Sequence, residues 1–194
     1  MTTLLFATNN QNKVTEIQSV VGRQIEVIGL SQAGIQLDIP EPHNTLEENA
    51  SEKSRTVYGL TGMNCFGEDT GLEVLALNGE PGVKSARYAG EEKDFGNNLK
   101  KLLARLGSEQ DRRARFRAVI SLIWNGTEYS FQGICEGRIS FEPRGSAGFG
   151  YDPVFIPAGS DKTFAEMDLD EKNKFSHRKK AADQLVLFLR ESGF

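Results

Sequence analysis

The sequence predicts an α/β protein built on a mixed sheet, and three observations lead to this fold class. Strand-like apolar runs alternate with helical patterns through the first half of the chain. In the second half, Asn125-Gly126 stands between two runs of alternating polar and apolar residues, which is the signal of a β-hairpin. No internal repeat and no linker rich in Pro, Gly and Ser interrupts the 194 residues. We therefore expect residues 1–194 to form a single domain, divided at most into two lobes that share the sheet.

The expected elements follow from the period of the apolar residues. Short apolar or alternating runs predict strands at 3–7, 25–30, 64–68, 72–77, 115–124, 128–140 and 152–157. Apolar residues that recur every three or four positions predict helices at 12–21, 45–58, 95–106 and 177–191. Pro81-Gly82 predicts a turn after the strand at 72–77.

The helix at 45–58 has the clearest start. Thr45 and Glu48 match the capping box, in which each side chain satisfies a backbone N–H of the first turn, so the helix should begin near residue 46. Asn49 and Lys53 are one turn apart and share a face that could line a cleft. The next face has the pattern of a solvated row of salt bridges, made by Glu48, Glu52 and Arg55.

Composition argues against several classes of partner. The formal net charge is −4 and the pI about 5.4, which does not favour nucleic acid or an anionic membrane surface. No run approaches the roughly 20 apolar residues of a transmembrane helix, and the N-terminus lacks the pattern of a signal peptide, so we expect a cytoplasmic protein. Arg113, Arg115 and Arg117 alternate along the chain. We interpret them as the exposed face of a half-buried strand, with a nucleic-acid-binding module as the alternative.

Cysteine and histidine usage limits the metals that the protein could bind. Cys65 and Cys135 lie far apart without the spacing of a zinc site, so we expect both to be small core residues. His43 and His177 are the two histidines of the chain, too few for a multi-histidine site. A metal would then bind through carboxylates and water, which suits Mg²⁺.

The segment "ATNNQNK", residues 7–13, joins the first strand to the first helix. Backbone N–H groups at such turns attract anions, so Lys13 in this position suggests a phosphate. The segment lacks the glycines of both common nucleotide-binding fingerprints. The alternative is that the asparagines are turn and cap residues and that Lys13 is solvated.

Two carboxylates stand at the end of an apolar run in "FGEDTGLEV", residues 66–74. In a strand, Glu68 and Asp69 should point to opposite sides, so a single site would use one of them as its main carboxylate. The alternative is a turn in which Asp69 and Thr70 cap the backbone and Gly71 adopts a positive φ. A third acidic residue, Glu41, falls in the loop before the helix at 45–58.

Two later segments also resemble binding sites. "GSAGFGYDP", residues 145–153, has three glycines around Phe149, Tyr151 and Asp152, which would let the backbone approach a ligand or simply form a loop. In "EKNKFSHRKKAADQL", residues 171–185, Ser176 is a cap that places His177 and Arg178 in the first helical turn. Cations there oppose the helix dipole, so we expect a bound anion or a keto oxygen beside them.

Six segments in this order give the chain a family resemblance: "ATNNQNK", "TLEENA", "EDTGLEV", "GEPGVKSARYAG", "GFGYDP" and "EKNKFSHR". Together they resemble the inosine triphosphate pyrophosphatase family, whose members hydrolyse deaminated purine nucleoside triphosphates. The resemblance runs over almost the entire chain. It implies an elongated mixed sheet with flanking helices, two lobes around a nucleotide cleft, and a homodimer.

The resemblance also implies roles for particular residues. Asp69 would be the catalytic carboxylate and, with Glu41, a ligand of the Mg²⁺ cofactor, and Lys53 would act close to the phosphates. Thr70 would contact the substrate. The triphosphate would bind to Thr8, Asn9, Asn10, Gln11, Asn12 and Lys13, and the base to Phe149, Gly150, Tyr151, Asp152, Lys172, His177 and Arg178.

One departure and three rival interpretations stand beside this resemblance. Family members often have Gly where this chain has His43, so Pro42 and His43 could reshape the loop that carries Glu41. The first rival is a pyrophosphatase of related fold that prefers modified pyrimidine or methylated nucleotides. The second is a nucleotide sensor without turnover, and the third is the nucleic-acid-binding module.

Overall fold

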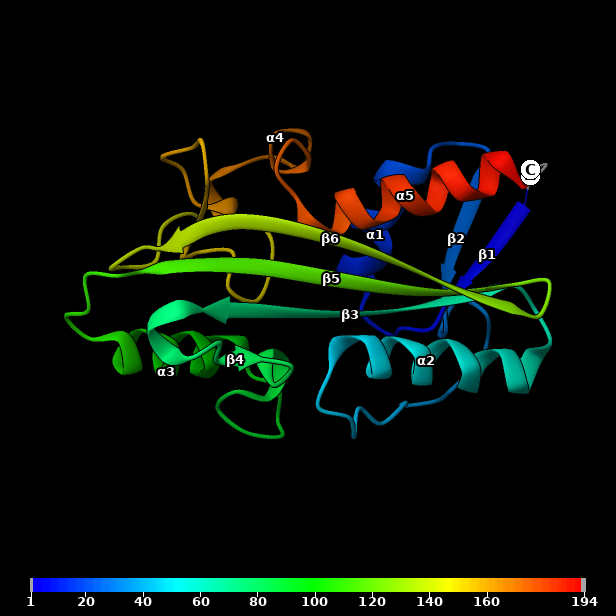
Figure 1. Ribbon diagram of the computed structural model, residues 1–194, viewed down its shortest axis with the longest axis horizontal. Coiled ribbons are helices and arrows are strands. Elements are labelled where there is room, and N and C mark those ends of the chain that lie inside the picture. The colour runs from blue at the N-terminus through cyan, green and yellow to red at the C-terminus, as the bar shows by residue number, and fades with distance from the viewer. Residues whose placement is uncertain (1, 193–194) are drawn as a thin grey trace. The chain divides into compact units, whose positions relative to one another are not determined.

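The structure is a computed structural model that describes residues 2–192, and its order of elements confirms the predicted α/β class (Figure 1). The strands are β1 Thr2–Phe6, β2 Ile25–Gly29, β3 Cys65–Val74, β4 Pro81–Gly82, β5 Arg113–Trp124, β6 Thr127–Ile139 and β7 Phe155–Pro157. The α-helices are α1 Gln11–Val21, α2 Leu46–Thr61, α3 Phe95–Leu106, α4 Leu169–Asn173 and α5 His177–Glu191. Short 3₁₀-helices occur at Leu75–Leu77, Ser85–Arg87 and Phe164–Glu166. No helix of the described part is long and apolar enough to cross a membrane.

The sheet is mixed, as the sequence predicts. Its strand order is β2-β1-β3-β5-β6-β7, with β4 paired to β3. β1 runs parallel to β2 and β3, whereas β3–β4 and β6–β7 are antiparallel pairs. Asn125 and Gly126 connect β5 to β6 with φ of 50° and 80°. Positive φ at both residues is the geometry of the predicted two-residue hairpin.

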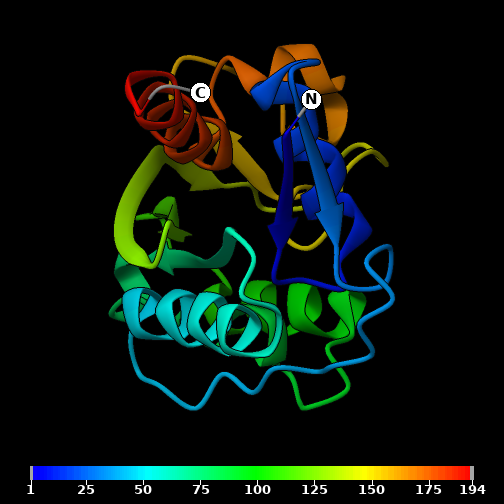
Figure 2. The ribbon, with the colours of Figure 1, turned by 90° about the vertical axis from the view of Figure 1, so that its right-hand side faces the viewer.

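The chain divides into two compact units. The first comprises residues 2–69, 118–133 and 178–192 of the described range. In it, α2 lies on one face of the sheet and α1 and α5 lie on the other (Figure 2). Alternate residues of β1 serve the two faces: Leu4 and Phe6 pack with α1 and α5, and Leu5 packs with Val57 of α2.

The second unit comprises residues 70–117 and 134–177. Its core joins the amphipathic α3, through Leu102 and Leu106, to aromatic residues of the strands and loops that follow. Phe116 of β5 packs against Phe155 and Phe164, with ring centroids 4.6 and 6.2 Å away. The basic run is structural, because Arg115 and Arg117 both pair with Glu73, at 2.7 and 3.1 Å, on the face opposite Phe116.

Four local predictions differ from the structure in part or in full. The runs at 64–68 and 72–77 form one strand, β3, so Asp69–Gly71 is extended rather than a turn, and Leu75–Leu77 is a 3₁₀ turn. Pro81-Gly82 forms the short strand β4, paired with Leu72 and Glu73 of β3, and it also begins a turn, in which the Lys84 N–H donates to the Pro81 carbonyl at 3.0 Å and Gly82 has a φ of 53°. β7 begins at Phe155 instead of residue 152, because residues 149–155 form hydrogen-bonded turns. The short helix α4 has no predicted counterpart.

The helix starts, in contrast, agree with prediction to within one residue. Thr45 caps α2 by accepting from the Glu48 N–H, and Asn10 caps α1 by accepting from the N–H groups of Asn12 and Lys13. The helix α2 runs to Thr61, three residues beyond the prediction, and ends at Gly62, whose φ is 65°. Caps are local in sequence, which is why these starts can be predicted.

Candidate active site

Two carboxylates and one ammonium group meet between α2 and β3 of the first unit. The Lys53 Nζ lies 2.6 Å from Glu41 Oε1 and 2.7 Å from Asp69 Oδ1, and it donates to the backbone carbonyl of Glu68 at 3.2 Å. Lys53 and Asp69 are each 6% exposed. The three charges sum to −1, so the group keeps an uncompensated negative charge that favours a further cation.

Asn49 ties the loop before α2 to this group. Its Oδ1 accepts from the His43 backbone N–H at 3.0 Å, and its Nδ2 donates to the His43 carbonyl at 3.3 Å and to Asp69 Oδ2 at 3.4 Å. Asn49 and Lys53 therefore share an inward face, as predicted. On the next face, Glu52 contacts His43 and Arg55 pairs with Glu128, at 3.6 and 2.7 Å.

Gly67 sets the distance between α2 and β3. A Cβ on this residue would lie 2.3 Å from the Ala50 carbonyl oxygen, 2.7 Å from Lys53 Cβ and 2.9 Å from the Ser54 nitrogen. The helix backbone thus rests directly on the strand at Gly67, two residues before Asp69. This close approach lets the Lys53 side chain reach both carboxylates.

Burial and neighbouring charges shift the pKa values of Asp69 and Lys53 in opposite directions. Burial raises the pKa of Asp69, the ammonium groups of Lys53 and Lys13 lower it, and the net pKa stays above its ordinary value. Burial lowers the pKa of Lys53, but Asp69 and Glu41 outweigh this effect and the pKa is raised. Lys53 is therefore a cation at neutral pH, and Asp69 has the raised basicity expected of a general base.

The donor set fits Mg²⁺ that is bound together with a phosphorylated substrate. Glu41 and Asp69 already converge on one cation, the Lys53 ammonium. Within residues 2–192, no group of three or more His, Cys, Asp or Glu side chains could hold a metal. Mg²⁺ commonly binds through one or two carboxylates, with water and substrate phosphates as the other ligands.

Glu68 faces the opposite side of β3, as the alternation of the strand predicts, and pairs with other cations. Its Oε2 lies 2.6 Å from Lys13 Nζ, and its Oε1 lies 3.0 Å from Arg178 Nη2. Arg178 also pairs closely with Glu16 of α1. The four residues are two cations and two anions, so their charges cancel. The anion expected beside Arg178 is therefore supplied by the chain itself.

The asparagines of the "ATNNQNK" turn have the turn and cap roles of the alternative interpretation, whereas Lys13 does not have its solvated one. Asn9 and Asn10 serve the fold: the Asn9 amide donates to the Leu37 carbonyl at 2.8 Å, and Asn10 caps α1. Thr8 Oγ1 accepts from the Asn10 N–H at 3.1 Å. The alternative of a solvated lysine is wrong, because the Lys13 side chain is 16% exposed and ion-paired. Gln11 and Asn12 lie exposed in the first turn of α1.

In the second unit, the glycine-rich segment forms a structured loop around Asp152. Its Oδ2 accepts from the Phe149 N–H at 2.9 Å and from Lys172 Nζ at 2.6 Å. A Cβ on Gly148, whose φ is 74°, would lie 2.0 Å from that oxygen, so only glycine fits there. The Lys172 ammonium also lies 5.5 Å from the centre of the Phe149 ring. The structure thus brings Phe149, Asp152 and Lys172 together.

The remaining predicted residues of this unit differ in exposure. Tyr151 is buried and its hydroxyl donates to the Ser85 carbonyl at 2.8 Å. His177 is buried with its ring stacked on Phe116, 4.6 Å between centroids and 11° between planes. Gly150 and Thr70 are partly exposed.

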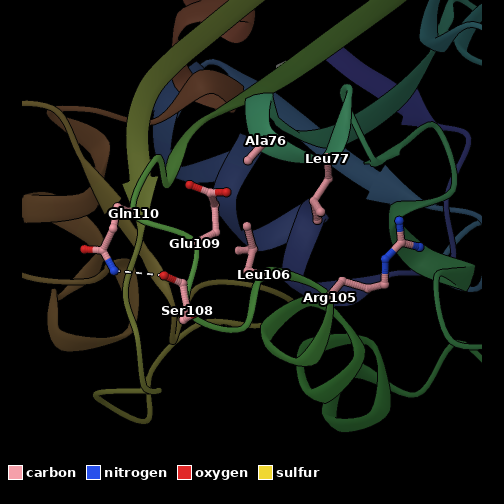
Figure 3. A pocket seen from close by; sticks show the side chains of 7 residues that line it. All are labelled: Ala76, Leu77, Arg105, Leu106, Ser108, Glu109 and Gln110. Carbon is pink, nitrogen blue, oxygen red and sulfur yellow. Dashed lines mark hydrogen bonds between the residues drawn. The ribbon is translucent and has the colours of Figure 1, made fainter.

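A hollow of about 360 Å³ lies elsewhere in the second unit (Figure 3). It is lined by residues of the 3₁₀ turn after β3 and of the end of α3 and its following loop: Ala76, Leu77, Arg105, Leu106, Ser108, Glu109 and Gln110. Arg105 forms an ion pair with Glu80, in which Nη1 lies 3.2 Å from Oε2. None of the residues predicted for the site lines this hollow, so we assign it no role.

Comparison with known proteins decides the family. The sequence profile of the Ham1 family matches residues 4–188. The chain belongs to the Ham1 family. It is 50% identical over 186 residues to the dITP/XTP pyrophosphatase of Christiangramia forsetii, covering 96% of this chain and 98% of that protein. It is 49% identical over 190 residues to the protein of the same name from Porphyromonas gingivalis, covering 97% and 98%.

Solved Ham1 structures have the same fold. The Staphylococcus aureus Ham1 protein superimposes with a TM-score of 0.87 at 40% identity, covering 98% of this chain and 99% of that one. A Ham1 protein from Coxiella burnetii gives a TM-score of 0.88 at 38% identity, covering 98% and 100%. The predicted fold class and family resemblance are confirmed.

The sequence patterns indicated no role for Glu16 or Gly67, and they did not single out Gly148 among the three glycines of residues 145–153. A signal for Glu16 was present, because it lies three residues after Lys13 on a helix and between Val14 and Ile17, which are buried. Gly67 and Gly148 have no such signal, since a glycine in a sequence does not tell which atoms approach it.

Proposed function

We propose that this Ham1-family chain hydrolyses ITP, dITP and XTP to the nucleoside monophosphate and pyrophosphate, and so keeps deaminated purines out of DNA and RNA. The observation that carries the proposal is the buried Lys53 ammonium between Glu41 and Asp69. A cation beside two carboxylates suits the chemistry of a metal-assisted phosphoanhydride hydrolysis. The relatives' name, dITP/XTP pyrophosphatase, supports two of these substrates, dITP and XTP, and the release of pyrophosphate.

In the proposed reaction, water attacks the α-phosphorus and the bond from that phosphorus to the pyrophosphate oxygen breaks. Asp69 accepts the proton of the attacking water, a role that suits its raised pKa. Lys53 neutralises charge on the phosphates, with Lys13 as a second cation. Glu41 and Asp69 would hold Mg²⁺, which, when bound, supplies positive charge that offsets the charge of the leaving pyrophosphate.

The triphosphate is proposed to bind at the start of α1, where a helix N-terminus favours anions. Lys13 is the main cation there and would exchange part of its contact with Glu68 for phosphate oxygens. Thr8, Gln11 and Asn12 would add hydrogen bonds. Asn9 and Asn10 are proposed to act chiefly by shaping the turn, since the Asn9 side chain bonds to the Leu37 carbonyl and the Ser31 hydroxyl and the Asn10 side chain caps α1.

The base is proposed to be read by Asp152, Lys172, His177 and Arg178, with Phe149, Gly150 and Tyr151 forming the pocket wall and Thr70 touching the substrate. Hypoxanthine and xanthine have a 6-keto acceptor and an N1–H donor, whereas adenine has the reverse pair. A carboxylate for N1–H and cationic donors for O6 would therefore mismatch adenine, and mismatched buried polar groups discriminate by about 10⁴ or more. Guanine shares both groups with hypoxanthine, so its rejection must involve its 2-amino group.

We further propose that the protein acts as a cytoplasmic homodimer with Mg²⁺ as its cofactor, as the family resemblance implies. Size measurement by light scattering tests the dimer: a mass of one chain would refute it.

Product analysis tests the proposed function directly. Purified protein with excess Mg²⁺ is supplied separately with ITP, XTP, GTP and ATP, and pyrophosphate, orthophosphate and monophosphate are quantified. We expect pyrophosphate with IMP or XMP, and far slower turnover of GTP and ATP. Orthophosphate release would refute the cleavage site. Equal rates on all four would refute the base preference, and no turnover would favour a sensor.

A further inference from the structure

Glu68 has a geometry that the proposed reaction does not use. Glu68 is 1% exposed, and its two carboxylate oxygens contact two different cations. Oε2 lies 2.6 Å from Lys13 Nζ, whereas Oε1 accepts from Arg178 Nε at 3.2 Å and lies 3.0 Å from Nη2. One carboxylate thus links the start of α1 to the start of α5.

The cost of this arrangement points to a function. Four charges are taken out of water, and buried ion pairs are often no more stabilising than apolar side chains of similar size. All four residues belong to the first unit and sit on the face of β3 opposite Asp69. Glu68 contacts the Lys53 cluster through its backbone carbonyl, whereas its side chain binds Lys13 and Arg178, the two cations proposed for phosphate and base.

We propose that Glu68 is a positioning residue that couples Lys13 to Arg178. This inference rests on the proposed function. As the counter-ion of Lys13, Glu68 withholds part of that positive charge from any polyphosphate. As the partner of Nε and Nη2, it fixes the plane of the Arg178 guanidinium, which a base-reading group requires. Glu68 thereby lowers the affinity of the protein for the triphosphate group, which ITP and ATP share, and raises its selectivity for the keto base over adenine.

The test compares Glu68→Gln with Glu16→Gln. Both variants remove one buried carboxylate charge next to Arg178, and Glu68 lies 2.6 Å from the Lys13 ammonium, so the comparison tests the effect of that contact. The first readout is the dissociation constant of inorganic tripolyphosphate, a ligand without a base, by titration calorimetry with Mg²⁺. The second is the ratio of kcat/KM for ITP over ATP.

We expect Glu68→Gln to bind tripolyphosphate about tenfold more tightly than wild type, since a charge 2.6 Å from the lysine is removed. We expect its ITP-over-ATP ratio to fall by on the order of tenfold or more. Glu16→Gln should also lower the ratio, but it should leave tripolyphosphate affinity within about twofold of wild type. A purely structural role for Glu68 would instead weaken tripolyphosphate binding.

Weaker or unchanged tripolyphosphate binding by folded Glu68→Gln, or an unchanged ratio, overturns the proposal. If that variant does not fold, the double variant Glu68→Gln with Arg178→Gln restores the charge balance, and it too must bind tripolyphosphate more tightly than wild type. Failure of the proposed function is separate: wild-type protein would then release no pyrophosphate from ITP.

Discussion

Replacing Gly67 by alanine should disturb the catalytic group without changing any charged residue. The added Cβ would lie 2.3 Å from the Ala50 carbonyl oxygen and 2.9 Å from the Ser54 nitrogen, both of them backbone atoms of α2. Backbone atoms inside a helix cannot rotate away as a flexible side chain can. The helix must therefore move off the strand.

The size of the movement follows from these contacts. Separations near 3.4 Å are ordinary for a methyl group, so the helix must shift by about 1 Å from its position on the strand. Overpacking of this kind costs about 1–3 kcal/mol, which lowers Tm by roughly 3–10 °C for a chain of this length. A displacement of about 1 Å at Lys53 would lower kcat by on the order of 10²-fold.

Thermal unfolding and steady-state turnover of ITP measure both effects. Gly59→Ala is the matched control, because Gly59 lies in the same helix with no atom within 4 Å of an added Cβ. The free energy of unfolding of Gly59→Ala should exceed that of wild type by about 1 kcal/mol, so its Tm should be slightly higher. Its activity should be unchanged. If Gly67→Ala melts and turns over like wild type, the close approach of α2 does not position Lys53.

Three further predictions concern single side chains. Asp69→Asn should lower kcat at least about 10²-fold with an unchanged circular dichroism spectrum, whereas the same change at the exposed Asp38 should have no effect; near-normal turnover would remove Asp69 as the base. Asn49→Ala should raise the Mg²⁺ concentration needed for half-maximal rate by roughly 10-fold, because the Glu41 loop loses its anchor to Asp69, and an unchanged Mg²⁺ dependence would contradict this. Burial raises the pKa of the Cys65 thiol from 9.0 to about 12, so Cys65 in a Cys135→Ser protein should react with thiol reagents about 10³-fold more slowly folded than unfolded at pH 8. Because the thiol ionises at lower pH in the unfolded chain, the contribution of Cys65 to stability is complete below pH 9 and is lost as pH rises toward 12. Equal alkylation rates of the folded and unfolded protein would refute the raised pKa of Cys65.

Local chemistry explains why so much of the fold was predictable. The caps at Asn10 and Thr45, the Asn125-Gly126 hairpin and the alternation of Arg115, Phe116 and Arg117 are each set by residues close in sequence. The strand β3 was predicted in two pieces, because Thr70 and Gly71 have the composition of a turn. Burial of both faces of β3, and the pairing of the next residues, Leu72 and Glu73, with β4, keep Thr70 and Gly71 extended.

The sequence by itself determined the fold class, the family and the identity of the charged residues. Caps, turns and apolar periods depend on residues a few positions apart, and the order of the family motifs can be read directly from the sequence. Only the tertiary structure decided which charges meet. Arg178 pairs with Glu16 across 162 positions, and Gly67 brings Lys53 to Asp69 by allowing a close approach. Partners in a buried ion pair are selected by packing and by the cost of leaving a charge unpaired, and neither quantity exists before the chain has folded.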